Sequence, residues 1–109
     1  MKESLIQKAI LEYLAARHIL AFRMQTGSVM KSYGGKQRRI SFGTPGMADI
    51  LACPQFLCDD GDWRPRFLWI EVKGDGKQSE LQKSFQAQVE EQNHTYIVAR
   101  SIEDVAAVL

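Results

Sequence analysis

The stretch FLWIEVKGDGKQSELQ, residues 67–82, decides how this chain folds. Its first half is a run of strand-forming apolar residues that also contains Glu71 and Lys73. Because side chains alternate along a strand, Glu71 and Lys73 are expected to project together, on the face opposite Ile70. Burying a charge costs several kcal/mol unless the charge is paired or binds a metal, so these two residues require a physical reason.

The rest of the chain reads as short helices and strands around this stretch. Predicted helices span residues 3–17, residues 79–92 and a short segment after Ser101, and predicted strands span residues 19–24, 48–53, 66–73 and 95–100. This order favours an α/β or α+β fold, and we take α/β as the class, with a small mixed β-sheet flanked by helices.

Two local patterns refine this outline. Ser79 followed by Gln82 is a capping-box pattern, in which the two side chains cap the start of a helix reciprocally. Residues 25–47 carry five glycines and a proline without sustained periodicity, and this composition predicts a long, basic loop.

Length and composition predict one soluble domain spanning residues 1–109. The chain is 45% hydrophobic and 25% charged, and no apolar run approaches the roughly 18 residues of a membrane span. Charges interrupt the N-terminal stretch, unlike a signal peptide, so a cytoplasmic location without membrane contact is expected. The two cysteines, Cys53 and Cys58, form no CxxC and have no histidine at zinc-finger spacing.

The net charge of +1 conceals an asymmetry along the chain. No acidic residue lies between Glu12 and Asp49, whereas the same segment carries Arg17, Arg23, Lys31, Lys36, Arg38 and Arg39. A basic segment without acids is a candidate phosphate-binding surface. The alternative is a solvated loop with ordinary surface cations, and charge alone does not separate the two interpretations.

The strands 48–53 and 66–73 are expected to pair, because Asp60-Gly61 between them is a turn signal. A hairpin symmetric about this turn sets position 49 opposite position 72, which brings Asp49 to about 5 Å from the neighbouring strand beside Glu71. A slip of one residue reverses the face that Asp49 shows, so the sequence leaves its side of the sheet open.

Two neighbouring carboxylates repel each other, and a divalent cation removes that cost. An all-oxygen set suits Mg²⁺, for which Mn²⁺ substitutes, and Lys73 beside it can stabilise charge on a phosphoryl oxygen. Asp49, Glu71 and Lys73 therefore indicate metal-assisted hydrolysis of a phosphodiester. The alternative is that Glu71 and Lys73 form an exposed pair on a half-solvated strand.

With these residues in place, the chain resembles the PD-(D/E)XK nuclease superfamily and, within it, the virus-type replication-repair nuclease (VRR-NUC) family. The matching elements, in chain order, are Glu3 in ESLIQKAILEYL, Arg23 in AFRMQTG, Asp49 in FGTPGMADI, Glu71 and Lys73 in WIEVK, and Gln82 in KQSELQKSF. They run from residue 3 toward the closing SIEDVAAVL, and Ala48 stands where the motif has proline.

The resemblance implies a restriction-endonuclease-like core and a role for each matching residue. Glu3, Asp49, Glu71 and the Val72 carbonyl would bind the metal, and Lys73 would be the catalytic lysine. Gln82 would belong to the active site, although its capping-box position accounts for it equally well. Arg23, with Lys31, Lys36, Arg38 and Arg39, would contact DNA, although Arg23 fits a surface ion pair equally well.

The function expected from the residues and the resemblance together is a Mg²⁺-dependent, structure-selective DNA endonuclease. Stand-alone members of the family resemble Holliday-junction resolvases, which implies a homodimer acting on branched DNA in a bacterial or phage-infected host cell. A chain of 109 residues has little surface for reading base edges, which favours recognition of DNA structure over sequence. The alternative is a non-catalytic nucleic-acid-binding module of a replication or repair assembly.

Overall fold

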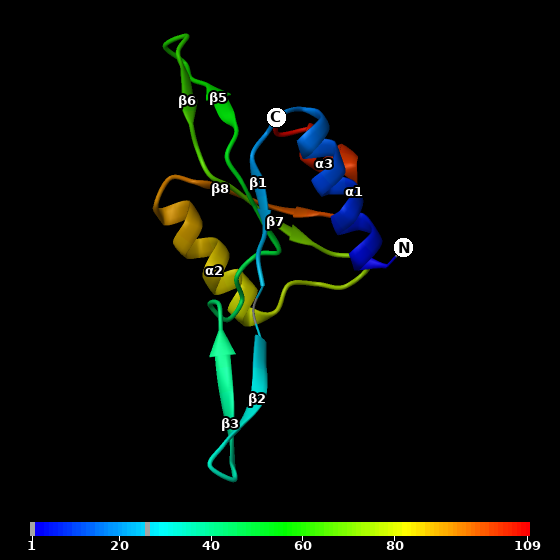
Figure 1. Ribbon diagram of the computed structural model, residues 1–109. Coiled ribbons are helices and arrows are strands. Elements are labelled where there is room, and N and C mark those ends of the chain that lie inside the picture. Colours follow the sequence, from blue (N-terminus) through cyan, green and yellow to red (C-terminus); the bar gives the residue numbers. More distant parts are fainter. Residues whose placement is uncertain (1, 26) are drawn as a thin grey trace.

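A mixed four-stranded sheet forms the centre of the protein (Figure 1). The computed structural model describes the backbone of residues 2–25 and 27–109, and their side chains apart from 27–29, 41 and 42. The elements are α1 (Glu3–Ala16), β1 (Ala21–Arg23), β2 (Gly27–Tyr33), β3 (Lys36–Phe42), β4 (Ile50–Ala52), β5 (Gln55–Leu57), β6 (Trp63–Pro65), β7 (Leu68–Val72), α2 (Glu80–Glu91), β8 (Thr95–Ala99) and α3 (Ile102–Ala106).

The central sheet has the strand order β1-β4-β7-β8. β4 is antiparallel to both β1 and β7, and β8 runs parallel to β7 after the crossover through α2. The helices α1 and α3 cover one face of the sheet and α2 covers the other (Figure 1). The predicted α/β fold with a small mixed sheet flanked by helices is confirmed.

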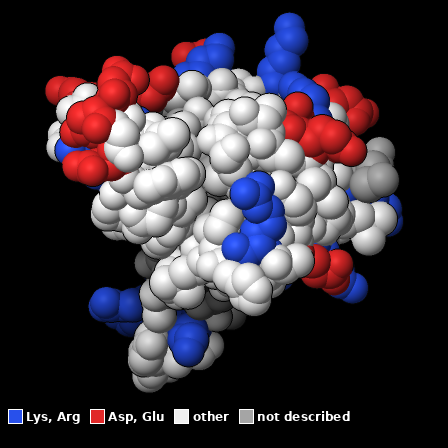
Figure 2. Space-filling model, turned by 90° about the horizontal axis from the view of Figure 1, so that it is seen from above, with Lys and Arg blue, Asp and Glu red and all other residues white. Residues whose placement is uncertain are grey.

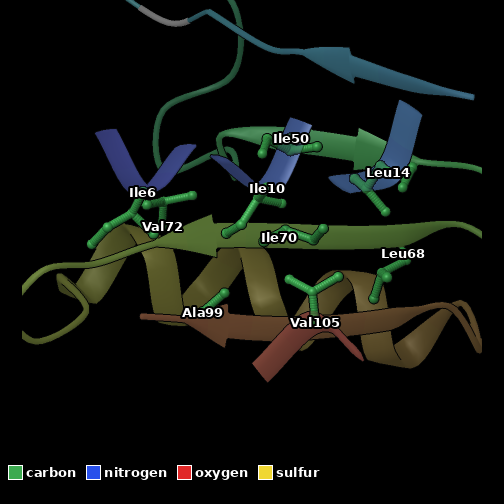
Figure 3. Close-up of a cluster of buried hydrophobic side chains, with 10 residues drawn as sticks. Ile6, Ile10, Leu14, Ile50, Leu68, Ile70, Val72, Ala99 and Val105 are labelled. Atoms are coloured by element: carbon green, nitrogen blue, oxygen red, sulfur yellow. The ribbon is translucent and has the colours of Figure 1, made fainter. Parts of the chain in front are cut away.

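The alternation of β7 divides the interior into two parts. Ile70 and the residues on its side of the strand pack against α1 and α3 in the main core, which comprises Ile6, Ile10, Leu14, Ile50, Ala52, Leu68, Ile70, Val72, Ala99 and Val105 (Figure 3). On the other face, a smaller cluster of Ala48, Val89 and Tyr96 packs beneath α2. Polar groups of β7 therefore lie on the α2 face, where the apolar packing is thinner.

The prediction of a loop over residues 25–47 is wrong for most of that segment. β2 and β3 pair along their whole length as a two-stranded antiparallel ribbon, which projects from the sheet (Figure 1). Its turn is Gly34-Gly35, with φ values of 55° and 79°, as a type I′ turn requires. The Gly-Gly pair is itself a hairpin signal, but the three other glycines of the segment favoured the prediction of a loop.

The predicted pairing of the strands around Asp60-Gly61 is confirmed, but its register is shifted by one residue. β4 pairs with β7 so that Ile50 lies opposite Ile70, and continuing this register sets Asp49 opposite Glu71. A second small hairpin, β5 with β6, forms inside the connection and extends away from the sheet (Figure 1). Because opposite residues share a face, Asp49 and Glu71 both lie on the α2 side.

Truncating a buried side chain of β7 should lower the free energy of unfolding more than the same truncation on the projecting ribbon. Ile70 is fully buried, so Ile70→Ala is expected to lower the free energy of unfolding by about 3 kcal/mol through lost burial and an unfilled cavity. Ile40→Ala is the matched control, because Ile40 lies on β3 with 37% of its surface exposed. Urea denaturation measures both variants, and an equal effect at the two positions would contradict this core assignment.

Candidate functional site

Glu71 is the buried charged residue at the centre of the site, with only 3% of its surface exposed. The Gln82 side chain donates a hydrogen bond from Nε2 to Glu71 Oε1 at 3.0 Å. No donor among the described residues reaches the other oxygen, Glu71 Oε2, although this atom is buried. A buried carboxylate oxygen without a donor is costly, and it leaves one position free to bind a ligand.

Asp49 lies next to Glu71 because the backbone holds it from two sides. The Val72 N–H donates to Asp49 Oδ2 at 2.8 Å, so the last residue of β7 orients the carboxylate. The Met24 N–H donates to the Asp49 carbonyl at 2.7 Å, which joins the residue to the chain that leaves β1. Asp49 is thus fixed although it lies just outside β4.

The environment of Glu71 raises the pKa of its carboxyl group from 4.5 to about 8. Burial is the main cause, followed by the charge of Asp49 and by a hydrogen bond to Asp49 that only the protonated form of Glu71 can donate. Glu3 adds a smaller raising effect, and the nearby charge of Lys73 lowers this pKa. The three other charged residues predicted for the site therefore act on the carboxyl group of Glu71.

Glu3 and Lys73 reach the site from different elements. Glu3 is in the first turn of α1, and its Oε1 accepts a hydrogen bond from the Gly74 N–H at 3.4 Å. Lys73 directly follows β7, where its N–H donates to the Ala99 carbonyl at 3.0 Å and its side chain is partly exposed. An acid from α1 and a base from the end of β7 thus both lie near Glu71.

Gln82 forms the capping box of α2 and also contacts Glu71. Its Oε1 accepts from the Ser79 N–H at 2.8 Å, which completes the capping box of α2, while its Nε2 binds Glu71. The start of α2 is held close to the site by Gly46, which has a φ of 80°. A Cβ at Gly46 would lie 2.3 Å from the Leu81 carbonyl oxygen, so only glycine allows this approach.

Two neighbours of the site were missed from the sequence. Gln78 donates from Nε2 to the Tyr96 hydroxyl at 3.2 Å and to Gln86 Oε1 at 2.9 Å. Burial raises the pKa of Tyr96 to about 12, and the charges of Glu71 and Asp49 add to this rise. Tyr96 lies on β8, beside Trp69 in the parallel register, and no sequence signal marks that strand as part of a polar site.

The predicted DNA-binding residues lie outside the carboxylate site. Arg23 is exposed on β1 opposite Ile50, which places it on the α1 side of the sheet and not on the side of Glu71. The other predicted residues, Lys31, Lys36, Arg38 and Arg39, are all exposed on the projecting ribbon. The chain that leads to the ribbon is joined to the site by the hydrogen bond that the Met24 N–H donates to the Asp49 carbonyl.

The donor atoms at the site are of the type that binds a hard divalent cation. In the described part of the chain, no group of three or more His, Cys, Asp or Glu residues is placed to hold a metal ion. Asp49 and the unpartnered Oε2 of Glu71 nevertheless present adjacent carboxylate oxygens, the ligand type that Mg²⁺ and Mn²⁺ prefer. Glu3 and the backbone of Val72 border the same place.

In comparisons with models of protein families, with curated proteins and with solved structures, the chain gives no match. The resemblance to VRR-NUC nucleases therefore stays a prediction that depends on the residues themselves. Separately, none of the helices formed by residues 2–25 and 27–109 is long and apolar enough to cross a membrane.

The raised pKa of Glu71 predicts a pH-dependent effect of Glu71→Gln on stability. The folded state holds a proton on Glu71 up to about pH 8, whereas the unfolded chain releases it near the ordinary pKa of 4.5. Wild type therefore loses stability as the pH rises through this window, and the neutral glutamine avoids that loss. Without divalent metal, the Tm of Glu71→Gln should exceed that of wild type by roughly 4 °C or more near pH 8.

The Tm difference between Glu71→Gln and wild type should shrink toward about pH 5, because at that pH both Glu71 and the glutamine are neutral in the folded protein. Glu12→Gln is the control, because Glu12 is exposed on α1. Thermal melts in EDTA across this pH range measure the effect. A Tm difference for Glu71→Gln that does not change with pH would show that Glu71 is not held protonated.

Proposed function

We propose that the protein is a metal-dependent DNA endonuclease of the PD-(D/E)XK type, selective for DNA structure. The observation that carries the proposal is the buried Glu71 carboxylate, which has Asp49 beside it and an Oε2 atom that no donor among the described residues reaches. Such an arrangement destabilises the folded chain unless it binds something, and its oxygen donors fit a hard cation. Lys73 and Gln82 at the same place match the motif order of the family.

Asp49 and Glu71 would hold the metal, with Glu3 and the Val72 carbonyl as the further ligands that the resemblance implies. Mg²⁺ is the expected ion, and Mn²⁺ should substitute for it. When bound, such an ion supplies Lewis-acid stabilisation of a phosphodiester under attack by water. Binding requires the ionised form of Glu71, so a proton should leave this carboxyl group as the metal binds.

The surrounding residues set the positions of the reacting groups. Val72 orients Asp49 through its N–H, and Gln82 holds Glu71 Oε1, so that Oε2 keeps a defined direction. The Lys73 ammonium can orient a water molecule and stabilise negative charge that develops on a phosphoryl oxygen. Because α2 and its capping box fix Gln82, the helix takes part in the geometry of the site.

The basic residues of the ribbon support DNA as the substrate class. Cations of the ribbon, among them Lys31, Lys36 and Arg38, would contact backbone phosphates, as would Arg23 at the root of the ribbon. Affinity should therefore fall steeply with salt. The chain carries little surface for reading bases, which favours branched DNA, such as a four-way junction, over a specific sequence.

Lys73→Ala should abolish cleavage and leave most DNA binding intact, because it removes the ammonium that stabilises developing charge. We expect the cleavage rate on a labelled four-way junction to fall by about a hundredfold or more. Binding of the same junction should change by less than roughly fivefold, the share of one phosphate contact. Lys8→Ala, which removes an exposed lysine of α1, should leave both unchanged.

Wild-type protein should cut the junction with Mg²⁺ or Mn²⁺ and not with EDTA. A gel shift without products under any metal condition would support the alternative, a non-catalytic nucleic-acid-binding module. Full activity of Lys73→Ala would contradict the mechanism. Discrete products from a linear duplex of mixed sequence would contradict selectivity for DNA structure.

The resolvase form of the proposal predicts a homodimer, because symmetric cutting of a four-way junction needs two active sites related by a two-fold axis. Light scattering at micromolar protein concentration should give twice the monomer mass of 12.4 kDa. A strictly monomeric protein under these conditions would exclude paired cutting by a preformed dimer. Nicking of branched DNA by single subunits would then replace it.

A further inference from the structure

The β2–β3 ribbon projects from the folded core as an arm. The protein extends 60 Å along its longest axis and about half of that across it, 31 by 26 Å, and the ribbon forms one end of this long axis (Figure 1). Every residue from Met30 to Ile40 is exposed. Residues 30–40 of the ribbon therefore contribute little to the core, and their side chains are free to meet another molecule.

The observed register sorts the cations of the ribbon onto two faces. Lys31 lies directly opposite Arg38, and Tyr33 lies opposite Lys36. Opposite residues and residues two positions apart share a face, so Lys31, Lys36 and Arg38 lie together. Arg39 lies opposite Met30 and projects from the other face. The sequence alone, read as a loop, does not make this distinction.

Two of these cations, Lys31 and Arg38, disfavour the pairing of the ribbon strands. Like charges directly opposite each other, as Lys31 and Arg38 are, destabilise a strand pair, and the ribbon contains no acid to offset them. The β5–β6 hairpin provides the contrast, because Arg64 there is ion-paired with Asp60 and Asp62. Viewed from the β5–β6 end, the surface carries both acidic and basic groups (Figure 2).

We propose that the face formed by Lys31, Lys36 and Arg38 grips the phosphate backbone of a duplex arm of the DNA substrate, whereas Arg39 on the other face does not. This inference rests on the proposed nuclease function and assigns the substrate a double-stranded arm next to the cut. A two-stranded β-ribbon has the width that a major groove admits, and its charged face can meet phosphates on the groove walls.

The connections at the root of the ribbon indicate how a DNA duplex bound by the ribbon would reach the carboxylate site. Met24, between β1 and β2, donates its N–H to the carbonyl of Asp49, and the chain leaving β3 returns through Gly46 to Asp49. The ribbon is thus joined to the carboxylate site at both of its ends. Seven paired residues reach roughly 23 Å, which corresponds to about seven base pairs of duplex.

The test compares Arg38→Ala with Arg39→Ala, two neighbouring arginines on opposite faces. Binding to a fluorescent four-way junction is measured by anisotropy in EDTA over a range of salt concentrations. Arg38→Ala should weaken binding by roughly fivefold and reduce the slope of log affinity against log salt by about one. Arg39→Ala should leave both within error, and Arg38→Lys should keep most of the affinity because the charge remains.

The combined variant Lys31→Ala/Lys36→Ala/Arg38→Ala should reduce the salt slope by about two to three. Its control, Lys8→Ala/Arg39→Ala/Arg66→Ala, removes the same number of exposed charges elsewhere. Wild type should bind junctions with arms shorter than about seven base pairs more weakly than junctions with longer arms. The combined variant should bind the short-armed and long-armed junctions equally. Circular dichroism verifies that each variant retains its folded signal.

Equal effects of Arg38→Ala and Arg39→Ala would overturn the face assignment, as would an arm-length effect that persists in the combined variant. If Arg38→Ala weakened binding to single-stranded DNA more than binding to duplex DNA, the assignment of a duplex arm to this face would be overturned. Because binding is measured without metal, the outcomes are separable from those for cleavage. Metal-dependent cutting without a difference between the faces refutes only the ribbon inference, and a difference between the faces without cutting refutes only the nuclease proposal.

Discussion

The structure of the site depends on one desolvated carboxylate. Glu71 is buried at the end of the central strand beside Asp49, and burial together with the charge of Asp49 raises the pKa of Glu71 to about 8. This arrangement opposes folding at neutral pH, because the carboxylate that is ionised in the unfolded chain must take up a proton as it is buried. Several backbone and side-chain hydrogen bonds nevertheless keep the two acids together, including those from Val72 and Gln82. The proposed binding of a metal ion by the pair would account for this cost in stability.

The central strand separates stability from chemistry by its alternation. Ile70 and its neighbours on one face bury the main core against α1 and α3, whereas Glu71 on the other face meets the first turn of α2. Mutations on the first face should act through packing and those on the second through charge. The two helical layers also deliver different groups, because α1 brings Glu3 to the loop after β7 and α2 brings Gln82 to Glu71.

The projecting ribbon extends the reach of a small chain. A compact protein of 109 residues offers little surface around a single site, but the ribbon adds a charged face at a distance from it. In the proposed function, the carboxylate site supplies the reaction and the ribbon supplies sequence-independent contacts to DNA. The backbone hydrogen bond from the Met24 N–H to the Asp49 carbonyl joins the root of the ribbon to the carboxylate site.

The sequence by itself determined the elements with strong local signals: the helices, the strands of the central sheet and the capping box of Ser79 and Gln82. It also identified Asp49, Glu71 and Lys73 as candidates, because charges within an apolar strand are costly unless they are paired or bind a ligand. Only the tertiary structure decided the side of the sheet on which Asp49 lies, since a register shift of one residue reverses it. The contacts of Gln78 with Tyr96 and the sorting of the ribbon cations likewise depend on pairing between distant or turn-linked strands, which local patterns do not encode.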